Sequence, residues 1–127
     1  MTWSTDDLDR IGAAEELHIA PRGMDGTLRR AVPIWVVRVG DELYVRSWRG
    51  DGGRWYRAAN TSGEAQVSAG GVSKVVALLA AGDEVNDAVD AAYREKYGRY
   101  TGYVEPMIAP QARATTLRLV PRSEAGA

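Results

Sequence analysis

The sequence predicts a mainly β protein of the α+β class: a small six-stranded antiparallel barrel with helices on its outside. Three observations support this prediction. Six short stretches are rich in residues that strands prefer, most of them are separated by hairpin-type turn sequences, and one longer stretch has helical periodicity. The length of 127 residues fits one domain, so we expect residues 1–127 to fold as a single unit.

Six strands are expected, at residues 17–20, 32–39, 43–48, 65–69, 72–81 and 115–120. Asp25-Gly26 and Gly70-Gly71 are hairpin turn sequences, because their residues tolerate positive φ. The run 32–39 is the most β-prone of the chain and is interpreted as one strand buried on both faces. Pro33 is expected near its start or at a bulge, because proline cannot donate a hydrogen bond to a ladder.

Both ends of the chain lie outside the predicted barrel. Residues 1–15 are expected to contain a short helix that Ser4 caps, with Leu8 and Ile11 on its apolar side. Residues 123–127 are expected to form a frayed tail.

Two further helices are expected between the strands. Residues 54–59 are predicted to form one or two helical turns. A longer helix begins after its cap, Asp83, and is followed by a loop that holds Pro106 and Pro110. Five residues have the spacing of its buried side: Val85, Ala88, Val89, Ala92 and Tyr93.

The composition excludes several kinds of chemistry. The chain has no cysteine and one histidine, His18, so it has no disulfide, no cysteine nucleophile and no two-histidine metal site. No apolar run approaches the roughly 20 residues that span a bilayer. The net charge of −1 argues against nucleic acid as a partner. We therefore expect a cytoplasmic protein without a bound metal, in which His18 is exposed or half-buried.

Arginines are concentrated in residues 22–57, where eight arginines stand against four acidic residues. Together with a serine hydroxyl and the free amides of a glycine-rich turn, such guanidiniums can hold a phosphate. The simpler alternative is a sheet with solvated arginines on one face. The residues concerned are Arg29, Arg30, Arg46, Ser47, Arg49, Gly50, Arg54 and Arg57.

Four of the six tyrosines lie close together in sequence, from the long predicted helix into the segment that follows it. Tyr93 continues the apolar side of that helix and is expected in the core. Tyr97, Tyr100 and Tyr103 recur every third residue, which suits one wall of a pocket. A phenol there can stack on a ring, donate a hydrogen bond or act as an acid. Aromatic packing over a barrel mouth, or a dimer contact, is the alternative.

The order of these motifs resembles the small deazaflavin-dependent nitroreductases of the flavin-binding split-barrel superfamily. The resemblance covers residues 16–122 and rests on Arg30-Ala31-Val32-Pro33, Gly40-Asp41, Tyr44-Val45-Arg46-Ser47 and Trp55-Tyr56-Arg57. The chain is also similar to a family of small bacterial proteins of unknown function near that superfamily. The resemblance implies a six-stranded antiparallel split β-barrel with flanking helices. It also implies homodimers with the cofactor at the subunit interface.

The same resemblance implies roles for individual residues. An arginine, a serine and a glycine turn would hold the phosphate of FMN or of a deazaflavin coenzyme, strand residues would back the ring, and tyrosines would face a small-molecule substrate. The implied cofactor-binding residues are Arg29, Arg30, Pro33, Ile34, Ser47, Arg49, Gly50, Trp55, Tyr56 and Arg57, and the implied catalytic residues are Tyr97, Tyr100 and Tyr103.

The predicted function is therefore a flavin- or deazaflavin-dependent oxidoreductase acting on a small aromatic or conjugated substrate. Two alternatives stay open. One is a cofactor-free module on the same scaffold that binds a small ligand or serves assembly, and the other is a cofactor-free isomerase or cyclase using Tyr100 or His18. The sequence leaves open whether the chain is an enzyme.

Overall fold

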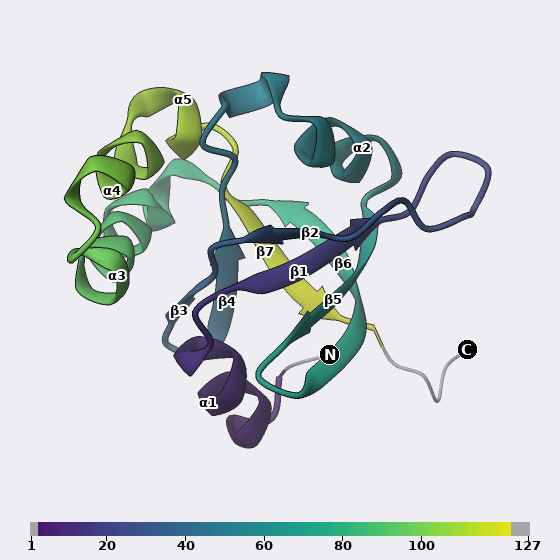
Figure 1. Ribbon diagram of the computed structural model, residues 1–127, viewed down its shortest axis with the longest axis horizontal. Helices are drawn as coiled ribbons and strands as arrows, with labels where there is room; N and C mark the ends of the chain where they lie inside the picture. The colour runs from purple at the N-terminus through teal and green to yellow at the C-terminus, as the bar shows by residue number, and fades with distance from the viewer. Residues whose placement is uncertain (1–2, 123–127) are drawn as a thin grey trace.

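The computed structural model describes residues 3–122, which fold into one antiparallel sheet, curled into a half-barrel and flanked by helices (Figure 1). The mainly β class is confirmed. The strands are β1 (Leu17–Pro21), β2 (Val32–Ile34), β3 (Val37–Val39), β4 (Glu42–Val45), β5 (Glu64–Ala69), β6 (Val72–Ala80) and β7 (Leu117–Pro121). The α-helices are α1 (Thr5–Ala13), α2 (Arg54–Ser62), α3 (Asn86–Tyr97), α4 (Thr101–Ile108) and α5 (Pro110–Arg113), with short 3-10 helices η1 (Gly50–Gly52) and η2 (Asp83–Val85) before α2 and α3.

The described residues contain seven strands rather than the six predicted, because the run 32–39 forms two strands. The strand order β2-β1-β5-β6-β7-β4-β3 places β2 and β3 at opposite ends of the sheet, although only Trp35 and Val36 separate them in sequence. The N–H of Val36 donates to the hydroxyl of Tyr97 (3.3 Å), and its carbonyl accepts from Nζ of Lys96 (2.7 Å). These bonds satisfy the backbone at the bend, so one β-prone run supplies both edges of the curled sheet.

Glycines at positive φ form the predicted hairpin turns. Strand β5 pairs along its whole length with β6, and Gly70 and Gly71 between them have φ of +57° and +84°. A side chain at Gly70 would place its Cβ 2.3 Å from the carbonyl oxygen of Arg10. The connection from β1 to β2 contains the predicted turn, with Gly26 at φ +87°. Glycine is therefore required at these turns.

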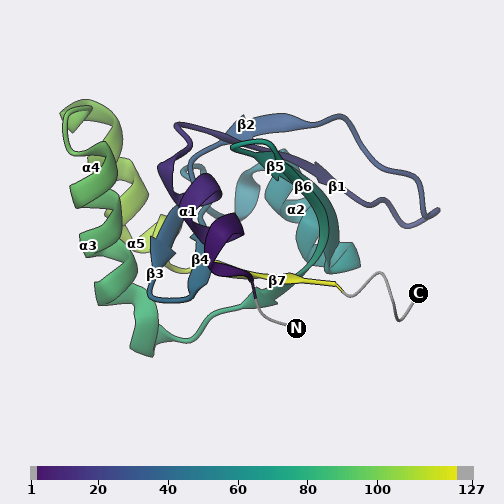
Figure 2. The ribbon, with the colours of Figure 1, turned by 90° about the horizontal axis from the view of Figure 1, so that it is seen from below.

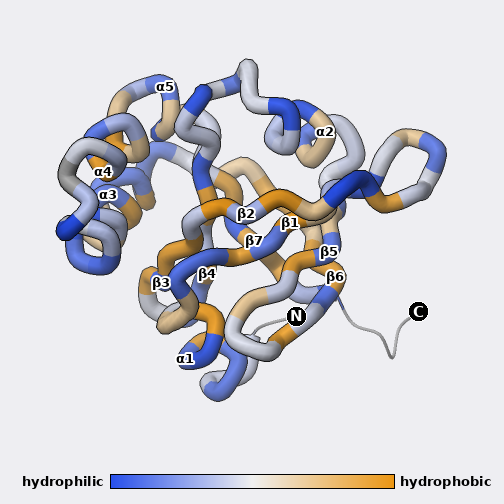
Figure 3. The backbone as a smooth tube through the Cα atoms, viewed as in Figure 1, coloured by the Kyte–Doolittle hydropathy of each residue, from blue (hydrophilic) through white to orange (hydrophobic). Residues whose placement is uncertain are grey.

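Buried apolar side chains form two clusters that use different faces of the strands. The curl of the sheet, closed by α1 and α2, holds the first cluster, with Leu8 and Ile11 of the predicted N-terminal helix. The second cluster lies between β3, β4 and the helices α3 and α4, and includes Tyr44 and Tyr93. Helices α3, α4 and α5 stand together on one side of the sheet, apart from α2 (Figure 2). Orange hydrophobic stretches follow the strands, while α3 and α4 alternate between blue and orange (Figure 3).

Three predictions about the helical side are wrong. Asp83, expected to cap the long helix, lies in η2, and α3 begins only at Asn86, without a side-chain cap. Ala88, expected on the buried side of the long helix, is exposed, whereas Val89 and Tyr93 are fully buried. The expected loop around Pro106 and Pro110 is helical: Pro106 lies within α4, and Pro110 is the first residue of α5, where a missing N–H is tolerated. None of the helices between residues 3 and 122 has both the length and the apolar character needed to cross a membrane.

Arg46, grouped above with the surface arginines, is instead buried, with 1% of its surface exposed. Its guanidinium donates to the carboxylate of Asp90 (2.6 Å), the hydroxyl of Thr116 (2.8 Å) and the carbonyl of Met107 (3.0 Å). It also donates to the backbone and side-chain oxygens of Asn86, both at 3.2 Å. These partners belong to α3, α4 and the segment before β7, so one side chain ties the helical layer to the end of β4.

We expect Asp90→Ala to lower the free energy of unfolding by about 3–5 kcal/mol, because it leaves the buried charge of Arg46 without its carboxylate. Urea denaturation measures the change. Asp87→Ala is the matched control: Asp87 also lies in α3 and pairs with an arginine, but its side chain is 96% exposed, and we expect a loss below about 1 kcal/mol. Equal losses in the two variants would contradict the role given to Arg46.

Candidate functional site

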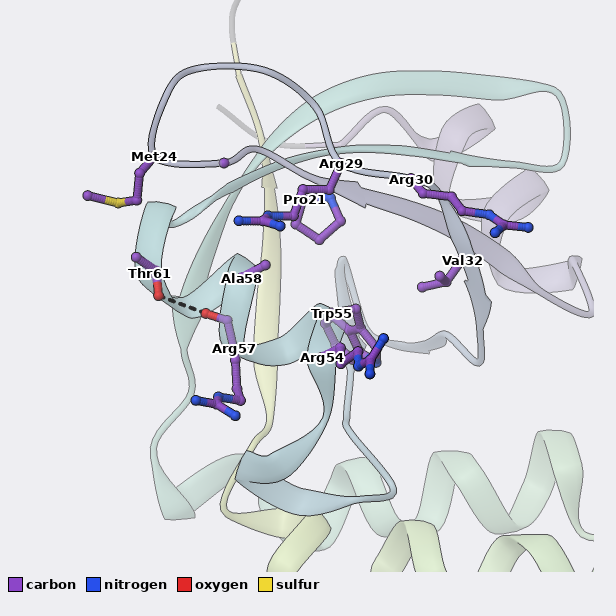
Figure 4. A pocket seen from close by; sticks show the side chains of 11 residues that line it. Pro21, Met24, Arg29, Arg30, Val32, Arg54, Trp55, Arg57, Ala58 and Thr61 are labelled. Atoms are coloured by element: carbon purple, nitrogen blue, oxygen red, sulfur yellow. Dashed lines mark hydrogen bonds between the residues drawn. The ribbon is translucent and has the colours of Figure 1, made fainter.

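A groove of about 630 Å³ lies between the β1–β2 connection and helix α2 (Figure 4). It is lined by Pro21, Gly23, Met24, Arg29, Arg30, Val32, Arg54, Trp55, Arg57, Ala58 and Thr61. Four of these residues are arginines and none is acidic. The groove therefore concentrates positive charge between two elements that are distant in sequence.

Backbone hydrogen bonds hold the upper wall of the groove in place. The N–H of Arg29 donates to the carbonyl of Pro21 (2.7 Å), and the N–H of Arg22 donates to the carbonyl of Glu64 in β5 (3.0 Å). The side chain of Arg22 also bonds to the carboxylate of Glu64 (2.5 Å) and to the carbonyl of Gly26 (2.5 Å). The connection is thereby fixed to the sheet, and Arg29 is carried to the rim.

The lower wall is one side of α2. Residues 54, 57, 58 and 61 lie three or four positions apart and so share a helix face, while Ala59 is buried in the first core cluster. The helix begins after Gly53, where a Cβ would lie 2.5 Å from the hydroxyl oxygen of Ser47. Glycine at this position lets the chain turn closely past Ser47 and start α2 beside the groove.

The four arginines of the groove are available for an external anion. All four are exposed, and within residues 3–122 none of their guanidiniums forms an ion pair or a side-chain hydrogen bond. Helix α2 has no side-chain cap at its N-terminus, so its first N–H groups add positive potential. One acidic residue, Asp25, lines a smaller adjoining cavity together with Arg29. A hydrogen bond from the hydroxyl of Thr27 lowers the pKa of Asp25.

The structure brings together only part of the predicted cofactor site. Arg29, Arg30, Trp55 and Arg57 all line the groove. Arg54, expected in the arginine cluster that could hold a phosphate, also lines it, and so does Val32, one of the strand residues expected to back the ring. Met24 and Thr61 line it without having been predicted.

The remaining predicted phosphate-binding residues lie elsewhere. Ser47 is buried, and its N–H donates to the hydroxyl of Thr115 (2.9 Å). The guanidinium of Arg49 lies over the ring of exposed Trp48, 5.0 Å from its centroid. Gly50 is buried, and a Cβ there would meet Gln111. Of the other predicted residues, Pro33 and Ile34 lie on β2 and Tyr56 packs partly into the first core cluster.

The three predicted catalytic tyrosines do not share a pocket wall. Tyr97 is fully buried and stacks on Trp35, with ring centroids 4.0 Å apart, and burial raises its pKa. The hydroxyl of Tyr100 donates to the carboxylate of Glu15 (2.6 Å), which lowers the pKa of that carboxyl. Tyr103 is 73% exposed. None of these three tyrosines lines the groove.

The histidine is exposed, as expected. His18 lies in β1, opposite Pro33 of β2 and Ser68 of β5. Among the described residues, no group of three or more histidine or acidic side chains is placed to hold a metal ion.

The fold occurs in solved structures of low sequence identity. A heme storage protein from Vibrio cholerae, HutZ, matches with a TM-score of 0.65 and 10% identity over 97% of this chain and 92% of the other. An FAD-binding protein from Mesorhizobium loti matches with a TM-score of 0.60 and 15% identity over 97% and 93%. An F420 reductase matches with a TM-score of 0.57 and 20% identity over 91% and 93%.

These likenesses show that the fold of this chain is shared with proteins whose sequences are very different, among them an F420 reductase and an FAD-binding protein. Among curated proteins, no sequence matches the chain. A family model matches residues 7–119, and the chain belongs to that family, described as uncharacterized proteins conserved in bacteria (DUF2255). The similarity to a bacterial family of unknown function is thereby confirmed.

Lys96 supplies a pH test of the packing beside Tyr97. Burial lowers the pKa of Lys96 to about 8, below its ordinary value of about 10.4 in an unfolded chain. Between these values the unfolded state binds more protons, so the free energy of unfolding should rise with pH from about 8 to 9.5. Denaturation at several pH values measures this rise, which Lys96→Met should lack. An identical pH dependence in both proteins would contradict the assignment.

Proposed function

We propose that this chain is a flavin- or deazaflavin-dependent oxidoreductase-like protein that holds the phosphate of its cofactor in the arginine-lined groove. The observation that carries the proposal is the gathering of Arg29, Arg30, Arg54 and Arg57 around one cavity with no acidic residue in its lining. Guanidiniums match phosphate oxygens in shape and charge and can bond to them in pairs.

The groove also suits the rest of such a cofactor. Pro21, Met24, Val32 and Trp55 give it apolar and aromatic surface beside the arginines, and a flat ring system can pack on such surface. When bound, the cofactor would supply hydride-transfer chemistry. The protein would bind its phosphate, orient it and keep water from the packed face of the ring.

The substrate of the proposed reaction is a small aromatic or conjugated molecule, and the proposed assembly is a homodimer. In such a dimer, a second copy beside the groove would cover the face of the cofactor ring that a single chain leaves exposed to water. The proposed catalytic tyrosines require such an arrangement, because within one chain Tyr97 is buried and Tyr100 is bonded to Glu15. Tyr103 is the most exposed of the three and is the best placed to reach a substrate held between two copies.

A cofactor-free binding module is the second candidate. It is favoured by Trp35, which stacks on Tyr97 within the second core cluster. The ring of Trp35 therefore fills the space beside Tyr97 that a ligand would need in order to contact this tyrosine. This candidate predicts that the groove binds small anions but not flavins.

Titration of the purified protein with FMN, riboflavin and a deazaflavin coenzyme, followed by fluorescence, tests the proposal. We expect FMN to bind with a Kd below about 100 µM. Riboflavin should bind at least about tenfold more weakly, since charge-assisted hydrogen bonds to a phosphate contribute about 1.5–3 kcal/mol each. The double variant Arg54→Gln/Arg57→Gln should lose this difference, whereas Arg94→Gln, at an exposed site on α3, should keep it.

Absence of binding by both FMN and the deazaflavin coenzyme at about 100 µM would exclude the cofactor proposal. Binding of riboflavin and FMN with equal affinity would show instead that the phosphate does not occupy the groove.

A further inference from the structure

Four aromatic side chains lie against one another beside the second core cluster, and none of them lines the arginine-rich groove. The rings of Trp35 and Tyr97 are parallel to within 2°, with centroids 4.0 Å apart. The centroid of Tyr100 lies 5.9 Å from that of Trp35, and the centroid of Tyr93 lies 6.1 Å from that of Tyr97. An electron can pass rapidly between rings in such close contact. The four rings can therefore share one oxidising equivalent.

Two of these rings are unfavourable places for an oxidised state. Tyr93 and Tyr97 are fully buried, and burial raises the pKa of both phenols. The guanidinium of Arg46 lies 5.5 Å from the ring centroid of Tyr93. Nζ of Lys96 lies 5.0 Å from the ring centroid of Tyr97. A positive charge at such a distance opposes the loss of an electron from the ring.

The proton acceptors distinguish the third tyrosine from these two. A phenol that loses an electron becomes a strong acid, so its oxidation at neutral pH requires a base for the proton. Among the described residues, the hydroxyl of Tyr93 has no hydrogen-bond partner, and that of Tyr97 donates to backbone carbonyls, which are very weak bases. The hydroxyl of Tyr100 donates to the carboxylate of Glu15 at 2.6 Å.

A guanidinium beside Tyr100 favours the release of this proton. The Arg99 group lies 4.6 Å from the ring centroid of Tyr100 and donates to the carboxylate of Glu15 at 2.8 Å. Its charge opposes a cationic radical on the ring, but not the neutral radical that remains after the proton has moved. The hydrogen bond from Tyr100 and the charge of Arg99 lower the pKa of Glu15, which is therefore ionised at neutral pH. Because Glu15 is exposed, an accepted proton can pass on to water.

We propose that Trp35, Tyr100 and Glu15 form a radical-transfer site that accepts one oxidising equivalent and holds it as a neutral tyrosyl radical. A strong one-electron oxidant of the peroxide-derived class takes an electron from Trp35. Tyr100 then gives an electron to Trp35 and its phenolic proton to the carboxylate of Glu15. The oxidant is reduced by one electron, Trp35 is restored, Tyr100 becomes a neutral radical and Glu15 is protonated. This activity needs neither the groove nor a bound flavin.

Electron paramagnetic resonance tests where the radical resides. The full chain is illuminated with ruthenium tris-bipyridine and persulfate, which together generate a one-electron oxidant, and is then frozen. We expect a tyrosyl signal that Tyr100→Phe largely removes, leaving a tryptophan radical. Tyr103→Phe is the matched control and should keep the signal, although Tyr103 is 73% exposed. Absence of a tyrosyl signal from the unmodified chain, an unchanged signal in Tyr100→Phe or its loss in Tyr103→Phe would overturn the proposal.

Transient absorption after a laser flash tests the proton acceptor, because it follows the decay of the tryptophan radical as Tyr100 is oxidised. Glu15→Gln keeps the size of the side chain and removes the base. It should slow this decay at least about tenfold, since a positioned base contributes about 10²–10⁴ to the rate of proton transfer. Glu16→Gln, at the neighbouring exposed residue, should leave the decay unchanged. Equal decay rates in Glu15→Gln and the unmodified chain would overturn the proposal.

Discussion

The buried guanidinium of Arg46 is the interaction on which the arrangement of the molecule depends. It bonds to Asp90 and Asn86 of α3, to the carbonyl of Met107 in α4 and to Thr116 before β7. A buried charge is costly unless it is paired and fully hydrogen-bonded. The helices therefore have to lie where their oxygens reach this one group, and the end of β4 is fixed with them.

The position of the groove follows from that fixed point. Ser47 follows Arg46 directly, and Gly53, which precedes α2, lies close to the hydroxyl of Ser47. The start of α2 is therefore positioned within a few residues of the buried ion pair. The opposite wall is set separately, because Arg22 and Glu64 tie the β1–β2 connection to β5. Exposed arginines thus line the groove from the β1–β2 connection and from α2, and an arginine bonded to a carboxylate lies at the base of each of these two walls.

Local patterns in the sequence predicted much of the fold and less of the site. Hairpin turns such as Gly70-Gly71 follow from backbone preferences, and the cap at Ser4 follows from local hydrogen bonding, so both could be predicted. The break at Trp35-Val36 could not, since it depends on Tyr97 and Lys96, about sixty residues away. Arg46 resembles the groove arginines in sequence, and only its distant partners, such as Asp90 and Asn86, distinguish it.

A crystal structure of the protein grown with FMN tests most directly whether the groove holds the phosphate of a flavin-type cofactor. We expect the phosphate oxygens of FMN within about 3 Å of guanidinium nitrogens from at least one arginine of the β1–β2 connection and one of α2. The ring should pack on the apolar surface that includes Trp55. FMN bound beside Tyr97 and Tyr100 with its phosphate away from these arginines would contradict a phosphate site in the groove.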